Sequence, residues 1–183
     1  MFTDLRRFSP AVLPMLSSEH VGRSCIGLIE INATGDPGFS LTAEQLSKML
    51  DAFASKAESL EMIYFTGTDP AGHPQLSNFI EMAYEKGIAR VGLQCDGLRI
   101  AHDDRLLATL SRLKPVVFLE FDGFDETTSL ILHGRRDLPF EAMRALDRLA
   151  AAKLPVALLT TVAMGANLQE VGAIADYGFK HPA

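Results

Sequence analysis

From Ser40 onward, short runs of β-branched and aromatic residues alternate with longer amphipathic stretches, and this alternation constrains the fold more than any other feature. It is typical of βα units and argues against a helix bundle or a β-sandwich. The predicted strands cover 62–66, 90–95, 116–121 and 156–162, and the predicted helices cover 42–57, 74–87, 103–113, 139–152 and 167–179. The sequence therefore predicts a parallel sheet with helices outside it.

One further strand is expected upstream, at either 16–21 or 26–31, and only the second segment is strongly β-favouring. We favour 16–21 as the sheet strand and leave 26–31 open. Right-handed crossovers between parallel strands curve such a sheet toward a partial barrel. The predicted fold class is α/β, a partial (βα) barrel of about five βα units that forms a single domain over residues 1–183.

Composition narrows the possible partners and compartment. The formal net charge of -6 and the pI near 5.3 disfavour nucleic acid and anionic membranes as partners. Two cysteines, Cys25 and Cys95, make no disulfide framework. No segment resembles an export signal or is long enough to span a bilayer. A cytoplasmic protein without nucleic-acid or membrane partners is expected.

Small and acidic residues follow the predicted strands, at the end where α/β folds gather their chemistry. Glycines there allow a ligand to approach the backbone closely, and carboxylates could hold an ammonium, ribose hydroxyls or a hard cation. The alternative is that these residues only form turns. The residues are Gly67, Thr68, Asp69, Asp96, Gly97, Asp122, Gly123, Thr161 and Asn167.

Glu120 is polar within a strand that is expected to be buried on both faces. An ionisable group there must be paired, hydrated in a cavity or protonated, so Glu120 favours a pocket over a solid core. Asn167, with Glu170 three residues on, is the expected N-cap of the last helix. The five histidines lack metal-ligand spacing, and His73 and His102 are interpreted as helix-entry residues.

Four segments together resemble the core of the radical SAM superfamily, in particular its tetraether-synthase-like and cofactor-maturase-like branch. They are YFTGTDPAGHPQLSNFIEMAYEKGI, VGLQCDGLRIA, VVFLEFDGFDETTSLILHGRRDL and PVALLTTVAMGANLQEVGAIADYGF, and the resemblance covers roughly residues 13–179. It implies a [4Fe-4S] cluster held by a CxxxCxxC loop after the first strand, and S-adenosylmethionine bound partly by a GGEP-like stretch after the second.

The chain departs from that pattern in both motifs. In CIGLIEIN, Cys25 takes the place of the first cysteine, while Ile29 and Asn32 stand where the other two would be. Neither of these side chains replaces a thiolate, so Cys25 is a lone remnant of the metal site, and Cys95 supplies at most one more ligand. The resemblance implies S-adenosylmethionine contacts at Gly67, Thr68, Asp69, Glu120, Asp122 and Asn167.

The main functional hypothesis is a radical SAM-like protein that has lost its cluster and acts as a binding, regulatory or scaffold protein. One alternative is a working radical SAM enzyme with an unusual or partner-supplied cluster site. Another is an acidic-rimmed enzyme that uses a divalent metal. The family core has six βα units where this chain has five, so we expect segment 156–162 to form an edge strand that pairs with a second copy or another protein.

Overall fold

The structure is a computed structural model that describes residues 25–33, 38–56 and 60–183. The strands are β1 (Cys25–Ala33), β2 (Phe39–Ser40), β3 (Leu60–Gly67), β4 (Arg90–Cys95), β5 (Val116–Glu120) and β6 (Val156–Leu159). The helices are α2 (Ala43–Lys56), α3 (Leu76–Glu85), α4 (Leu98–His102), α5 (Asp104–Leu113), α6 (Glu126–His133), α7 (Leu138–Ala151) and α8 (Val171–Lys180), with short 3-10 turns η2 (Pro70–Gly72) and η3 (Leu168–Glu170).

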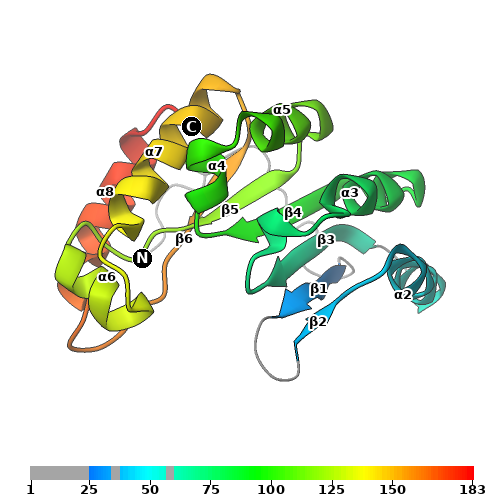
Figure 1. The fold of residues 1–183 in the computed structure, drawn as a ribbon, viewed down its shortest axis with the longest axis horizontal. Coiled ribbons are helices and arrows are strands. Elements are labelled where there is room, and N and C mark those ends of the chain that lie inside the picture. The colour runs from blue at the N-terminus through cyan, green and yellow to red at the C-terminus, as the bar shows by residue number, and fades with distance from the viewer. Residues whose placement is uncertain (1–24, 34–37, 57–59) are drawn as a thin grey trace.

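The strands form one sheet in the order β2-β1-β3-β4-β5-β6. β2 runs antiparallel to β1, and every other neighbouring pair is parallel. The sheet curves without closing, and the helices lie along its outer side (Figure 1). The predicted α/β partial barrel with helices outside is confirmed.

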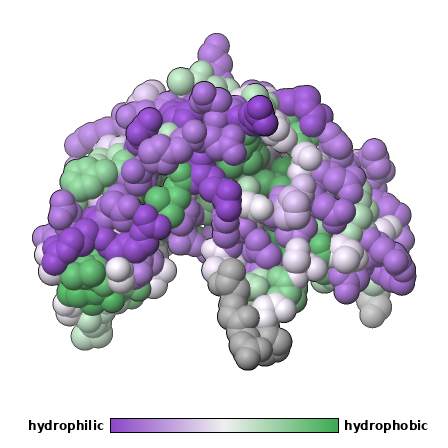
Figure 2. Space-filling view, viewed as in Figure 1, coloured by the Kyte–Doolittle hydropathy of each residue, from purple (hydrophilic) through white to green (hydrophobic). Residues whose placement is uncertain are grey.

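The strands alternate between a helix-facing side and an inner side. On β1, Ile29 and Ile31 are buried under the helices, whereas Leu28 is 64% exposed on the inner side. Helix α2 begins with a capping box, because Gln45 N donates to Thr42 Oγ1 and Thr42 N donates to Gln45 Oε1. In Figure 2 hydrophobic surface lies in the hollow of the curved molecule, while the outer helices show mostly hydrophilic surface.

The first described strand corresponds to the segment that sequence analysis left open. β1 contains residues 26–31 and pairs in parallel with β3 along most of its length. The favoured alternative, 16–21, lies outside the described residues. The β-favouring residues of 26–31 therefore do form a strand of the sheet.

Several elements differ from the sequence-based expectation, and three of the differences lie near the strand ends. The stretch between the predicted strand 116–121 and the predicted helix 139–152, where no element was predicted, contains α6, which Asp125 caps by accepting from Thr127 N. β6 ends at Leu159 and not at residue 162, because Thr160 turns its hydroxyl back to Phe121 O. The last helix begins at Val171, after η3, and not at Asn167. In the first two cases a side chain supplies a hydrogen bond that periodicity does not reveal.

β6 is the last strand of the sheet, so its outer edge has no strand beside it within the described part of the chain. An apolar groove of about 460 Å³ runs between this edge and α8. A partner strand at this edge stays a prediction. Among the described helices, none is both long and apolar enough to cross a membrane.

His73 holds the entry of α3 against β2, in agreement with its interpretation as a helix-entry residue. Its Nδ1 accepts from Gln75 N at 3.1 Å, so the neutral ring carries its proton on Nε2, which lies 2.9 Å from Ser40 Oγ. The side chain is 5% exposed, and burial lowers the pKa of His73 below its usual value of 6.5. A protonated ring could no longer accept from Gln75.

We expect the free energy of unfolding to fall as the pH drops below about 6.5. The folded state resists protonation of His73 while the unfolded chain accepts the proton, so this contribution is complete above that pH and is lost below it. Urea unfolding of the wild type and of His73→Asn between pH 5 and 8 measures the effect. The asparagine keeps an acceptor near the Nδ1 position and does not titrate, so its profile should be flatter. Identical slopes would contradict this role.

Candidate functional site

Asn32, near the end of β1, forms hydrogen bonds with the residues that follow β3. Its Nδ2 donates to Asp69 O at 2.6 Å, and its Oδ1 accepts from Asp69 N at 3.2 Å. Thr68 N donates to Asn32 O at 3.1 Å. Sequence analysis placed Asn32 at a lost cysteine position. In the structure it fixes the turn that carries Gly67, Thr68 and Asp69.

The Asp69 carboxylate is already engaged by groups of the same chain. Oδ2 lies 2.7 Å from Arg99 Nε, on α4, and Oδ1 accepts from Gly72 N at 3.1 Å. Both side chains of the ion pair stay partly exposed, so the pair contributes little to stability. Asp69 faces the rim as predicted, but its charge is balanced by Arg99.

A chain of polar side chains crosses the inner face of the sheet. Tyr64 and Thr66 donate their hydroxyls to Gln94 Oε1 at 3.1 and 2.9 Å, and Gln94 Nε2 donates to Glu120 Oε1 at 2.6 Å. Burial, and then the nearby Glu120 carboxylate, raises the pKa of Tyr64 to about 12. Tyr64 therefore stays a donor at neutral pH. Glu120 accepts the last hydrogen bond of this chain. This bond partly satisfies its carboxylate at the side of the pocket that was predicted for it.

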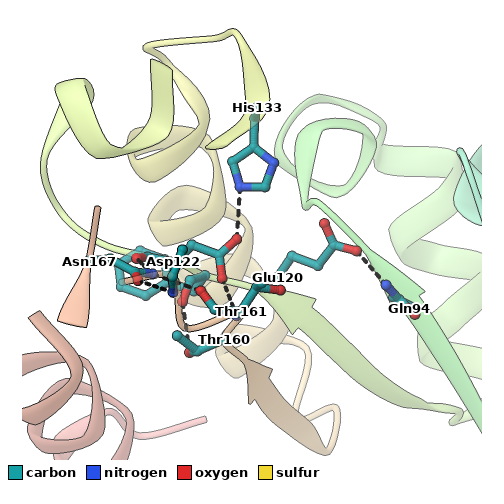
Figure 3. A network of polar contacts seen from close by, with 9 residues as sticks. Gln94, Glu120, Asp122, His133, Thr160, Thr161 and Asn167 are labelled. Atoms are coloured by element: carbon teal, nitrogen blue, oxygen red, sulfur yellow. Dashed lines mark hydrogen bonds and ion pairs between the residues drawn. The ribbon is translucent and has the colours of Figure 1, made fainter. Parts of the chain in front are cut away.

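Asp122 is nearly buried and is fixed from two sides (Figure 3). His133, from the last turn of α6, places Nε2 2.8 Å from Asp122 Oδ2, and Thr161 N donates to Asp122 Oδ1 at 2.5 Å. Glu120 and His133 both point into the space above the strand ends (Figure 3). The carboxylate thus orients the histidine ring at the rim, an arrangement that acid-base and binding sites share.

Asn167 is fully buried behind the rim. Its Nδ2 donates to Asp122 O at 2.7 Å and to Thr161 O at 2.8 Å, and its Oδ1 accepts from Ala163 N at 2.8 Å. The expected N-cap is wrong, because no side-chain capping bond forms there. A direct contact of Asn167 with a cofactor stays a prediction. Its observed contacts hold Asp122 in place.

Glu170, the other half of the expected capping pair, also makes long-range contacts. Its Oε2 accepts from Phe124 N at 2.6 Å, and its Oε1 accepts from Thr128 Oγ1 at 2.7 Å. The carboxylate lies where a side chain on Gly123 would be, so a larger residue at that position would displace Glu170. Glu170 therefore ties α8 to the loop after β5.

These elements enclose a rim cavity of about 330 Å³ at the carboxyl ends of β3, β4 and β5. Five of its lining residues come from the predicted set: Gly67, Thr68, Asp69, Asp96 and Glu120. Sequence analysis gave no role to His133, and it favoured an exposed loop position for Arg135 over a clamp for a carboxylate or phosphate. Both line the cavity, and Arg135 pairs with Asp137 at 2.6 Å. The unrecognised helix α6 is what brings them to the rim.

The two cysteines lie at opposite ends of the sheet. Cys25 begins β1 in register with Leu60, at the end away from the rim, whereas Asn32 is in register with Gly67 at the rim. The backbone from Cys25 to Asn32 spans about 23 Å at the usual rise of a parallel strand. The alignment of CIGLIEIN with a loop after the first strand is therefore wrong, because this segment is the strand itself.

Cys95 ends β4 close to the rim, but its side chain belongs to the hydrophobic core and is 4% exposed. Burial raises the pKa of its thiol to about 12. Cys95 is nevertheless among the residues that line the rim cavity, so it could offer at most one thiolate there, whereas a cluster needs several. The segment between β1 and α2 contains no cysteine.

A model of the radical SAM superfamily matches residues 21–178. This chain belongs to the radical SAM superfamily. The 7,8-dihydro-6-hydroxymethylpterin dimethyltransferase of Methanocaldococcus jannaschii is 25% identical over 134 residues, which are 73% of this chain and 26% of that protein. The resemblance inferred from the sequence is confirmed at the level of the superfamily, and the branch stays a prediction.

Two solved structures have the same fold as this radical SAM protein. Native anSMEcpe with bound AdoMet and Kp18Cys peptide has a TM-score of 0.62 at 18% identity, covering 84% of this chain and 49% of that one. Streptococcus suis SuiB bound to its precursor peptide SuiA has a TM-score of 0.60 at 12% identity, covering 76% and 31%. This chain spans at most about half the length of these proteins.

The donor set of this chain does not fit the [4Fe-4S] cluster that the family implies. A cluster needs several thiolates around one point, whereas this chain has two cysteines, and their backbone positions lie at opposite ends of the sheet. Within the described ranges, no three His, Cys, Asp or Glu side chains come together as a metal site. The acidic rim therefore gives no support to the divalent-metal alternative in that part of the chain.

Proposed function

We propose that this chain is a non-catalytic member of the radical SAM superfamily that binds a small polar ligand in its rim cavity and holds no cluster of its own. The placement of its two cysteines carries this proposal. Cys25 starts β1 at the far end of the sheet, and Cys95 is a single, buried cysteine at the end of β4. With at most one thiolate at the rim, the chain lacks the set of ligands that a cluster for reductive cleavage of S-adenosylmethionine needs.

The rim cavity supports the binding half of the proposal. It is roomy, open to solvent and lined by carboxylates, backbone around Gly67 and the His133 ring. Its polar groups are held by defined partners, so the cavity is preorganised for a ligand. S-adenosylmethionine is one candidate, since AdoMet is bound in the similar anSMEcpe structure. In a regulatory or scaffold role, binding of a ligand in this cavity would be the signal to which the protein responds.

Reconstitution with iron and sulfide under anaerobic conditions tests the absence of a cluster. The matched controls are Cys25→Ala, Cys95→Ala and the double variant, which report adventitious iron and sulfide. We expect the wild type to stay colourless after desalting and to retain no more iron and sulfide than the double variant. A brown wild-type protein with near-stoichiometric iron and sulfide, lost in the double variant, would overturn the proposal and favour the enzyme hypothesis.

A further inference from the structure

A small second pocket lies beside the rim cavity, between the end of β5 and helices α6 and α7. Its volume is about 20 Å³, and Glu120, Asp96, His133 and Leu138 line both it and the rim cavity. A space of this size accommodates one water-sized group. The small pocket and the rim cavity therefore suit a ligand with a compact polar head and a larger body.

Charge in this region is negative and incompletely balanced. Asp69 is paired with Arg99 and Asp122 with His133. Within the described residues, Glu120 and Asp96 form no ion pair. Asp96 accepts from Leu98 N, and Glu120 accepts from Gln94, which leaves one carboxylate oxygen of each without a donor in the described ranges 25–33, 38–56 and 60–183, so that oxygen is open to a ligand. A cationic head group would complement these two carboxylates.

Ser129 supplies an independent observation. It lies on α6, is 4% exposed and lines the small pocket, and its buried Oγ has no hydrogen-bond partner among the residues that the structure describes. An unpaired buried hydroxyl costs about 1–3 kcal/mol, so natural structures rarely retain one. A ligand donor in the small pocket would satisfy it.

We propose that the small pocket binds the ammonium head of a primary amine whose body lies in the rim cavity. An alkylammonium group has three N–H donors and no acceptor, which matches the Glu120 carboxylate, the Asp96 carboxylate and the Ser129 hydroxyl. It is also close to water in size. This inference rests on the proposed function only because it takes the rim cavity as a ligand site. The ammonium group would lie in the small pocket, away from the Asp69–Arg99 pair.

Calorimetric titration with 1,4-diaminobutane tests the proposal, and tetramethylammonium, a cation without N–H donors, is the control ligand. We expect the diamine to bind and tetramethylammonium not to. Glu120→Gln should weaken diamine binding at least about tenfold, because a charge-assisted contact becomes a neutral one. Glu126→Gln, which changes an exposed carboxylate on α6, should leave it unchanged.

Ser129→Ala separates a ligand contact from a structural role. Removing the unpaired hydroxyl should raise the free energy of unfolding of the free protein and lower its affinity for the diamine about threefold or more. A variant that gains stability and keeps its affinity would assign Ser129 to packing and contradict the proposed contact.

S-adenosylmethionine, which also carries a primary amine, forms a second arm of the titration. Binding that is weakened by Glu120→Gln supports the small pocket. Binding that depends on Asp69 alone, or no heat with any amine, would overturn the amine site. None of these results changes the outcome of cluster reconstitution, so the two proposals fail separately.

Discussion

The Gly67→Ala variant is expected to lose about 3 kcal/mol or more of its free energy of unfolding. Gly67 has a φ of +147°, which favours glycine, and an added Cβ would overlap Asn32 O and Asn32 Oδ1. These atoms accept the hydrogen bonds that join the ends of β1 and β3. Because one of them is backbone, the clash is relieved only when the two strand ends move apart.

Urea unfolding at neutral pH measures this loss, and Gly87→Ala is the matched control. Gly87 also has a positive φ, +81°, but nothing lies within 4 Å of an added Cβ. The control should therefore lose only about 1 kcal/mol, the cost of the backbone conformation alone. Equal losses in the two variants would show that the hydrogen bonds of Asn32 with Thr68 and Asp69 do not constrain position 67. The diamine affinity of any folded Gly67→Ala protein should also fall, since Asn32 positions the rim.

The Asn167→Ala variant has the second large expected effect, again a loss of about 3 kcal/mol or more. Asn167 is fully buried, and its amide satisfies Asp122 O, Thr161 O and Ala163 N. Alanine leaves all three backbone groups without this partner in a site that water reaches poorly. Thr161 N also donates to the Asp122 carboxylate, so the orientation of His133 should be disturbed as well.

Gln169→Ala is the control for this variant. Gln169 is an exposed amide two residues further on, and its Nε2 donates to Ala166 O at 2.9 Å. Its loss should change the free energy of unfolding by less than about 0.5 kcal/mol, because water replaces an exposed hydrogen bond. A small effect of Asn167→Ala, similar to the control, would mean that the segment after β6 is held by other contacts.

Local patterns in the sequence predicted most of the architecture. Helix α2 is an example, since its apolar positions recur at helical spacing and Thr42 and Gln45 form the capping box at its start. Periodicity reports on residues within one or two turns of each other. It missed α6, whose eight residues carry a weak amphipathic pattern, and it extended β6 through residues that serve the site.

The sequence predicted many of the residues that line the candidate site, but fewer of the contacts between them. Gly67, Asp69, Asp96 and Glu120 were expected at the strand ends and do line the cavity. His133 was missed because its partner, Asp122, is reached only through a helix that was interpreted as a loop. Glu170 was assigned to a local cap, whereas its carboxylate binds backbone 46 residues away in sequence. Contacts of this kind depend on how two elements pack.

The sequence by itself determined the class of fold, the succession of βα units and the end of the sheet at which polar residues gather, because each follows from local periodicity and from the chirality of the crossover connections. Only the tertiary structure decided that Cys25 lies at the opposite end of the sheet from Asp69, and that Asn167 holds Asp122. Strand register and helix packing set these distances, and both are fixed by contacts between residues far apart in the chain.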